Sequence, residues 1–217
     1  MAVEAVIWDF GGVFTSSPFE AFNRYEASRG LPVDFIRRVN ATDPHENAWA
    51  LFESARIDAA GFDAKFLAEA TALGHAVRGS EVLPLLSGEL RPRMVEALEA
   101  CKARYKVGCI TNNVPQGLSP VRAADAGAMS SADVMALFDE VIESSKVGVR
   151  KPDPAIYRMM CEALQVEPAA CVYLDDLGIN CKPAAQMGMT AIKVVSEAQA
   201  LADLARATGL TLGLAAA

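Results

Sequence analysis

The sequence predicts an α/β fold: a Rossmann-like parallel sheet with helices on both faces, and a helical subdomain inserted after the first strand. Two observations predict it. Short apolar runs, each ended by small or polar residues, alternate with segments of helical periodicity. One long interval, between the first run and the second, breaks this alternation. With 217 residues, of which 52% are hydrophobic, the chain is large enough to bury a core without disulfides or a structural metal.

The apolar runs are interpreted as buried strands. Parallel strands that are covered on both faces carry nearly continuous apolar and β-branched residues, and not an alternating pattern. The runs span 3–8, 106–110, 140–143, 171–174 and 190–195. Because they are separated by helical segments, we expect them to pair in parallel within one open sheet.

Helical patterns lie between these runs. The segments 91–104 and 153–164 each place apolar residues three to four positions apart, which gives each helix one apolar face. A short helix is expected over 182–187, ended by Gly188, since glycine favours the position after a helix. The alanine-rich tail 201–217 is expected to form a final helix that frays towards its end.

The interval 16–90 is rich in helix-forming residues and is punctuated by glycine and proline. Four helices are predicted in it, over 19–29, 33–40, 48–55 and 60–73. We therefore predict two parts: a helical cap at 16–90 and a Rossmann-like core made of 1–15 and 91–217.

Charge and composition exclude several classes of partner. The net charge is −7 and the pI about 4.9, which disfavours nucleic acid and anionic membrane surfaces, because both require a basic footprint. No apolar stretch is long enough for a transmembrane helix, and the N-terminus has no signal-peptide pattern. The five cysteines are scattered and odd in number, as in a reduced, cytoplasmic protein. The apolar content is compatible with a monomer or a homodimer.

Polar residues follow three of the predicted strands. In open α/β sheets, ligands bind at the carboxyl ends of the strands. The residues expected there are Asp9, Thr111, Asn112, Asp175 and Asp176, with Lys151 shortly after the third strand. Crowded carboxylates repel one another unless a cation lies between them, and oxygen ligands without histidine suit Mg²⁺. A Mg²⁺ ion beside a lysine and a hydroxyl donor suits a phosphoryl group.

Four segments, in this order, resemble the haloacid dehalogenase-like superfamily. They are VIWDFGGV at 6–13, GCITNN at 108–113, SSKVGVRKPDPAIY at 144–157 and VYLDDLGINCKPAAQMGM at 172–189. The last two are the most specific, and they are particularly similar to the N-terminal phosphatase domain of soluble epoxide hydrolases and to related small bacterial phosphatases. The inserted segment fits the helical cap of this family in position and character.

The resemblance implies a Mg²⁺-dependent phosphatase that acts on a small phosphorylated molecule through an aspartyl-phosphate. Asp9 would be the nucleophile and a Mg²⁺ ligand, and the backbone carbonyl of Gly11 a second ligand. Asp176 would bind Mg²⁺ directly or through water, with Asp175 supporting it. Asn180 lies where this branch often has a polar contact near the metal.

The resemblance also implies a set of phosphate contacts. Thr111 would hold the transferring phosphoryl oxygens, with Asn112 beside it and the Gly11-Gly12 backbone nearby. Lys151 would neutralise the charge of the nucleophile and the phosphate. Lys146 is an alternative cation, but the Lys-Pro pair at 151–152 is the one that matches the family.

The first segment departs from the pattern of most phosphatases in the family. Those read Asp-x-Asp, where the second Asp is the general acid/base; here Gly11 stands at that position. A glycine cannot protonate a leaving group, and such help is typically worth ~10²–10⁴ in rate. Three interpretations stay open: a slow phosphatase or one that favours good leaving groups, an acid supplied from elsewhere such as His45 in the cap, or a domain that binds without catalysing. A 2-haloacid dehalogenase is a weaker alternative, because its Asp-x-Tyr-Gly-Thr motif is not matched.

Overall fold

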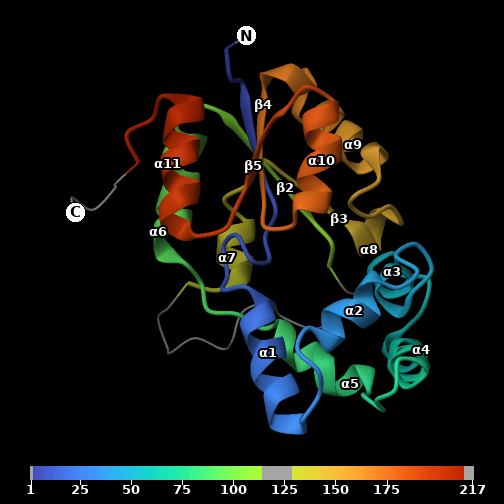
Figure 1. Ribbon diagram of the computed structural model, residues 1–217. Helices are drawn as coiled ribbons and strands as arrows, with labels where there is room; N and C mark the ends of the chain where they lie inside the picture. The colour runs from blue at the N-terminus through green and yellow to red at the C-terminus, as the bar shows by residue number, and fades with distance from the viewer. Residues whose placement is uncertain (1, 114–128, 213–217) are drawn as a thin grey trace.

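The computed structural model describes residues 2–113 and 129–212 of the chain. Its centre is a five-stranded parallel sheet with the strand order β3-β2-β1-β4-β5 (Figure 1). The strands are β1 (Ala5–Trp8), β2 (Lys106–Thr111), β3 (Glu140–Glu143), β4 (Cys171–Asp175) and β5 (Thr190–Lys193). The predicted parallel α/β sheet is thus confirmed, and the first strand lies at its centre.

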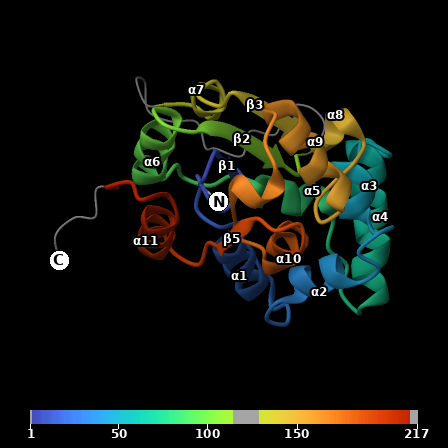
Figure 2. The same cartoon turned by 90° about the horizontal axis from the view of Figure 1, so that it is seen from above.

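Helices cover both faces of the sheet (Figure 2). On one face Val6 and Trp8 of β1 pack in one core cluster with residues of α6 (Pro92–Lys102) and α11 (Glu197–Thr208). On the other face Ala5 and Ile7 share a second cluster with α9 (Pro154–Leu164) and α10 (Gly178–Gln186). β1 is fully buried, which explains why its sequence is apolar at every position and not at every second one.

The strand register aligns the carboxyl ends of β1, β2 and β4. Trp8 is level with Cys109 in β2 and with Leu174 in β4. The residues that follow, beginning with Asp9 and Asp175, therefore leave the sheet at the same edge. This is the edge at which the polar residues were predicted to meet.

Some helix bounds differ from the predictions. α10 begins at Gly178, not at residue 182, because the Leu177 carbonyl accepts from the backbone N–H groups of Asn180 and Cys181. α11 begins after Ser196, whose side chain accepts from the Gln199 N–H, and it ends at Thr208; residues 213–217 lie outside the described part. The short helices α7 (Ser131–Met135) and α8 (Ser144–Val147) were not predicted.

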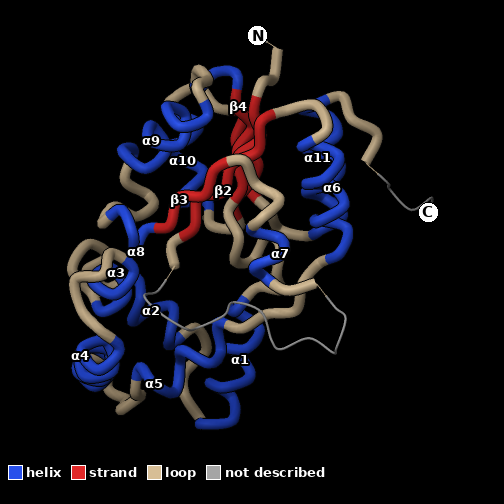
Figure 3. The backbone as a smooth tube through the Cα atoms, turned by 180° about the vertical axis from the view of Figure 1, so that it is seen from behind, coloured by secondary structure: helices blue, strands red, loops and turns tan. Residues whose placement is uncertain are grey.

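Between β1 and β2 the chain forms a group of helices, which we call the helical subdomain. It contains α1 (Pro18–Arg29), α2 (Phe35–Ala41), α3 (Ala48–Glu53), α4 (Ala59–Ala72), α5 (Gly79–Val82) and the 3₁₀ helix η1 (Leu83–Leu86). Its buried side chains, such as Phe35, Trp49 and Phe62, form a hydrophobic cluster of their own. In Figure 3 these helices lie together beyond the end of the sheet.

An antiparallel bridge joins the two chain segments that connect the helical subdomain to the sheet. Thr15 pairs with Leu90, and the Ser16 N–H donates to the Glu89 carbonyl at 2.8 Å. The ingoing and outgoing chains therefore run side by side at this junction. None of the helices in residues 2–113 and 129–212 has the length and apolar character needed to cross a membrane.

Candidate active site

Asp9 lies where β1 ends, at the centre of the sheet edge. Its backbone N–H donates to the Leu174 carbonyl at 2.8 Å. Its Oδ1 accepts from the Phe10 N–H at 2.7 Å and lies 2.7 Å from Nζ of Lys151. The carboxylate is thus held by the backbone of its own turn and by one buried ammonium group.

Asp175, at the end of β4, is fully buried and is surrounded by donors. Oδ2 accepts from Lys151 Nζ at 2.8 Å and from the Tyr173 hydroxyl at 2.6 Å. Oδ1 accepts from the Leu177 N–H at 2.8 Å, and the Asn180 amide reaches both oxygens, at 3.0 and 3.1 Å. Because both oxygens are engaged in this way, the geometry favours Asp175 as a holder of Lys151 over Asp175 as a metal ligand.

Lys151 joins Asp9 to Asp175 and is only 1% exposed. Burial lowers the pKa of its ammonium, but Asp175 and Asp9 outweigh this effect, so the pKa lies above its ordinary value. Its charge is therefore permanent at neutral pH. Lys146, the alternative cation, is exposed and pairs with Glu143, so the structure brings Lys151 and not Lys146 to Asp9.

Asp176 stands beside Asp9 and Asp175 in a three-carboxylate cluster. One oxygen of each residue lies within 4.8 Å of the others. Burial raises the pKa of Asp9 well above its usual range; the charge of Lys151 opposes this shift, and the charges of Asp175 and Asp176 add to it. Burial, followed by the charge of Asp175, raises the pKa of Asp176 to about 7. Both shifts reflect negative charges crowded together away from water.

The turn after β1 explains the two glycines. Gly12 has φ +73, and a Cβ added to it would lie 2.2 Å from Oδ2 of Asp176, so only glycine fits between the turn and that carboxylate. The Gly12 carbonyl accepts from the Arg91 guanidinium at 2.8 Å. At Gly11, by contrast, an added Cβ meets nothing within 4 Å. The position of the missing acid is open space, so sterics do not explain why glycine is there.

The carboxylate cluster fits a divalent cation. Three carboxylates against one ammonium leave two negative charges, which such an ion would balance. Within the described residues, the candidate ligand atoms of this cluster are all carboxylate oxygens; the family resemblance adds the backbone carbonyl of Gly11. This donor set is the one that Mg²⁺ prefers.

Thr111 ends β2, and Asn112 follows it at the same edge of the sheet. Thr111 is the last residue of that strand and is 8% exposed. The Asn112 side chain contacts the backbone of Lys151: Oδ1 accepts from its N–H at 2.9 Å, and Nδ2 donates to its carbonyl at 3.0 Å. Asn112 was predicted as a phosphate contact; in the structure its amide holds Lys151.

Several side chains at this edge were not found from the sequence. In the sequence, Tyr173 is one residue of an apolar strand and Arg150 one residue of a motif, and neither pattern predicts the contacts that the side chain makes. Glu53, the last residue of α3, reaches Arg150 and Asn112 from the helical subdomain. No local pattern marks Glu53. His45, one of the alternatives left open for the missing acid, is exposed, and its neighbour Pro44 accepts from Arg150 through its carbonyl at 3.2 Å.

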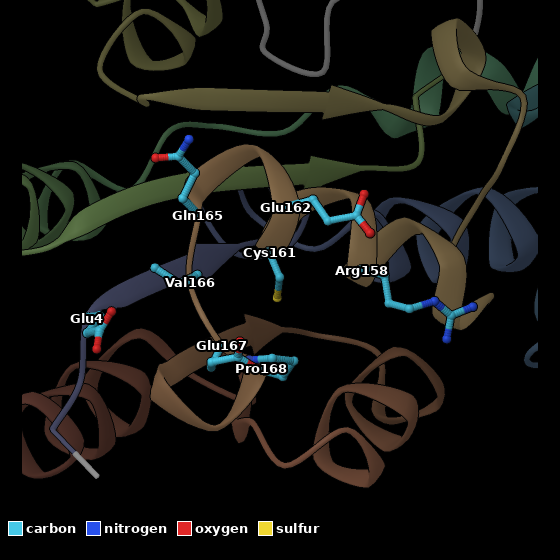
Figure 4. A pocket seen from close by; sticks show the side chains of 8 residues that line it. All are labelled: Glu4, Arg158, Cys161, Glu162, Gln165, Val166, Glu167 and Pro168. Carbon is cyan, nitrogen blue, oxygen red and sulfur yellow. The ribbon is translucent and has the colours of Figure 1, made fainter.

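A separate pocket lies at the opposite edge of the sheet (Figure 4). It is lined by residues that precede β1 and β4 and by the end of α9, among them Glu4, Cys161 and Glu167. None of the predicted site residues lines it. Because ligands of parallel sheets bind at the carboxyl ends of the strands, the carboxylate cluster is the better candidate for the active site.

Comparison with known proteins gives a consistent result. The family of haloacid dehalogenase-like hydrolases matches residues 3–188. The chain is 30% identical over 220 residues to bifunctional epoxide hydrolase 2 of Mus musculus; the match covers 96% of this chain and 39% of the mouse protein. It is 29% identical over 205 residues to a phosphatase of Mycobacterium tuberculosis, covering 89% of this chain and 88% of the relative.

A solved structure shares the fold. It is a haloacid dehalogenase family enzyme of Bacteroides thetaiotaomicron in complex with magnesium and inorganic phosphate. The TM-score is 0.60 at 18% identity, and the match covers 90% of this chain and 96% of the other.

Proposed function

Because the chain belongs to the family of haloacid dehalogenase-like hydrolases, we propose that it is a Mg²⁺-dependent phosphomonoesterase that acts on a small phosphorylated molecule. One observation carries the proposal: the Asp9 carboxylate stands at the end of the central strand, 2.7 Å from a buried ammonium and within a cluster of three carboxylates. The curated phosphatase relative supports this activity over a domain that binds without catalysing.

Mg²⁺ would be held by the carboxylates of Asp9 and Asp176 and by the Gly11 carbonyl. When bound, it would supply charge that offsets the carboxylates and the phosphoryl oxygens. The magnesium and phosphate in the Bacteroides enzyme support the same ion here.

The reaction would take place in two steps on Asp9. Its free oxygen attacks phosphorus, a new O–P bond forms, and the bond to the leaving group breaks. Water then attacks phosphorus, the bond between phosphorus and Asp9 breaks, and inorganic phosphate leaves as the carboxylate is restored. Solvent takes up the proton that the attacking water loses and supplies the proton that the leaving group gains. Lys151 keeps the Asp9 carboxylate in place and offsets the negative charge that gathers around phosphorus. Thr111 is proposed to donate to a phosphoryl oxygen.

Gly11 determines which leaving groups the enzyme is expected to favour. No side chain at this position can protonate the departing oxygen. A substrate whose leaving group is stable as an anion needs little protonation, so the reaction is least impaired with such a substrate. We place the helical subdomain as the cap that excludes water and selects the substrate.

The test is hydrolysis of para-nitrophenyl phosphate by the wild type and by Asp9→Asn, with Mg²⁺ and with excess EDTA. Nitrophenolate is a good leaving group, so the assay is insensitive to the missing acid. We expect Mg²⁺-dependent turnover that disappears in Asp9→Asn. Glu20→Gln, which removes an exposed carboxylate on α1, is the matched control and should keep full activity. Equal turnover in the wild type and in Asp9→Asn would refute the proposal.

A further inference from the structure

Glu53 connects the helical subdomain to the edge of the sheet. It is the last residue of α3, and its Oε2 accepts from Arg150 through Nε at 2.8 Å and lies 2.7 Å from a second guanidinium nitrogen. Its backbone carbonyl accepts from the buried Ser144 hydroxyl at 2.7 Å. Figures 1 and 3 both show α3 beside α8, the helix that Ser144 begins. Glu53 is thus fixed by the core through its side chain and its backbone.

The same oxygen of Glu53 faces the amide that holds Lys151. Asn112 Nδ2 donates to Glu53 Oε2 at 3.3 Å and to the Lys151 carbonyl at 3.0 Å. The N–H and carbonyl of Lys151 set which end of the amide faces which group, and Glu53 accepts from the same Nδ2, so it adds a third contact that holds the Asn112 side chain in this place. A continuous series of contacts therefore runs from α3 through Asn112 and Lys151 to Asp9.

The cost of placing Glu53 here argues against an incidental surface pair. The side chains of Glu53 and Arg150 are 15% and 26% exposed. Burial raises the pKa of Glu53 in spite of the opposing charge of Arg150. Burying a carboxylate costs free energy unless it is paired and hydrogen-bonded. The partner of Glu53 is Arg150, which directly precedes Lys151 in the chain.

We propose that Glu53 is a positioning residue of the reaction on Asp9: by holding Asn112 and Arg150, it fixes Lys151 and so completes the active site from the helical subdomain. The proposal rests on the proposed function. It implies that the site is fully assembled only when the helical subdomain packs against the sheet as it does here.

The test compares Glu53→Gln with Glu46→Gln. Glu46 forms an exposed ion pair with Arg56 within the helical subdomain and is the matched control. We expect Glu53→Gln to lower kcat by about 10- to 100-fold, the effect of one charge-assisted hydrogen bond, while KM changes by less than about threefold. Glu46→Gln should leave both constants unchanged. Arg150→Met should resemble Glu53→Gln, and the double variant should lose no more than the worse single variant.

A second measurement does not depend on turnover. The thermal unfolding midpoints of Glu53→Gln, Lys151→Met and the double variant should be non-additive, because the series of contacts couples the two residues. Additive shifts, or a kcat of Glu53→Gln equal to that of the control, would overturn the inference and leave the proposed function standing. If the wild type shows no Asp9-dependent turnover, the proposed function fails, and non-additive midpoints would support only the contact series.

Discussion

Lys151→Met removes the one positive charge between two buried carboxylates. The ammonium lies 2.7 Å from Asp9 and 2.8 Å from Asp175, and the residue is 1% exposed. Methionine has a similar length and fills the same space, so the change removes charge with little loss of packing. The variant therefore reports on the electrostatics of the site.

The expected loss is large because the carboxylates are left without their partner. Removing one member of a buried ion pair typically costs ~3–5 kcal/mol. For a chain of this size, each kcal/mol lowers the melting temperature by roughly 2–4 °C, so the total is roughly 6–20 °C. Without Lys151 the carboxyl groups take up protons more readily in the folded state than in the unfolded one. The loss should therefore shrink as the pH falls towards 5, where protonation relieves the repulsion.

Thermal unfolding at pH 8 and at pH 5, in EDTA, measures this prediction. The matched control is Lys146→Met, which removes an exposed lysine that pairs with Glu143. The control should change the free energy of unfolding by no more than the ~0.5 kcal/mol typical of surface changes, which shifts the midpoint by roughly 2 °C at most. A Lys151→Met variant as stable as the control at pH 8, or one that loses more stability at pH 5 than at pH 8, would refute the reasoning.

Two further predictions concern the first turn and the metal. Gly11→Asp should fold normally, because its Cβ meets nothing within 4 Å, and it should raise turnover of an alkyl phosphate by up to ~10²–10⁴-fold by restoring an acid; a folded variant with unchanged turnover would contradict this. Gly12→Ala should instead lower stability by at least ~1–2 kcal/mol, the cost of the left-handed backbone alone, as measured by urea unfolding. Mg²⁺ affinity, measured by calorimetry, should rise with pH up to about 7, because burial raises the pKa of Asp176 to about 7 and a protonated carboxyl must lose its proton to bind. An affinity that is flat from pH 6 to pH 8, or the same slope in Asp176→Asn, would count against Asp176 as a ligand.

The sheet and its edge residues could be predicted from the sequence because their signals are local. A strand buried on both faces must be apolar at each position, as β1 is, and a polar residue directly after it must lie at the strand end. Asp9, Thr111 and Asp175 were placed at the correct edge by this reasoning alone. Parallel pairing then aligns the ends, since the register of β1 with β2 and β4 leaves little freedom.

Helix bounds were less predictable, because hydrogen bonds outside the apolar pattern decide them. The apolar pattern predicted a helix over 182–187. In the structure the Leu177 carbonyl accepts from the N–H groups of Asn180 and Cys181, so α10 begins earlier. Ser196 acts in the same way for α11. These contacts depend on the conformation of the preceding loop, which periodicity does not report.

Only the tertiary structure decided which contacts each residue of the site makes. Asp175 and Asp176 are adjacent in the sequence, yet one is enclosed by four donor groups and the other faces Gly12. Lys151 and Lys146 are both close to the third strand, yet only Lys151 reaches Asp9. Glu53 meets Arg150 across 97 positions of the chain. The sequence determined which groups stand at the sheet edge. Their pairing was set by how the strand ends, the segment that carries Lys151 and, for Glu53, the helical subdomain pack together, because a contact between distant segments exists only once both have been placed.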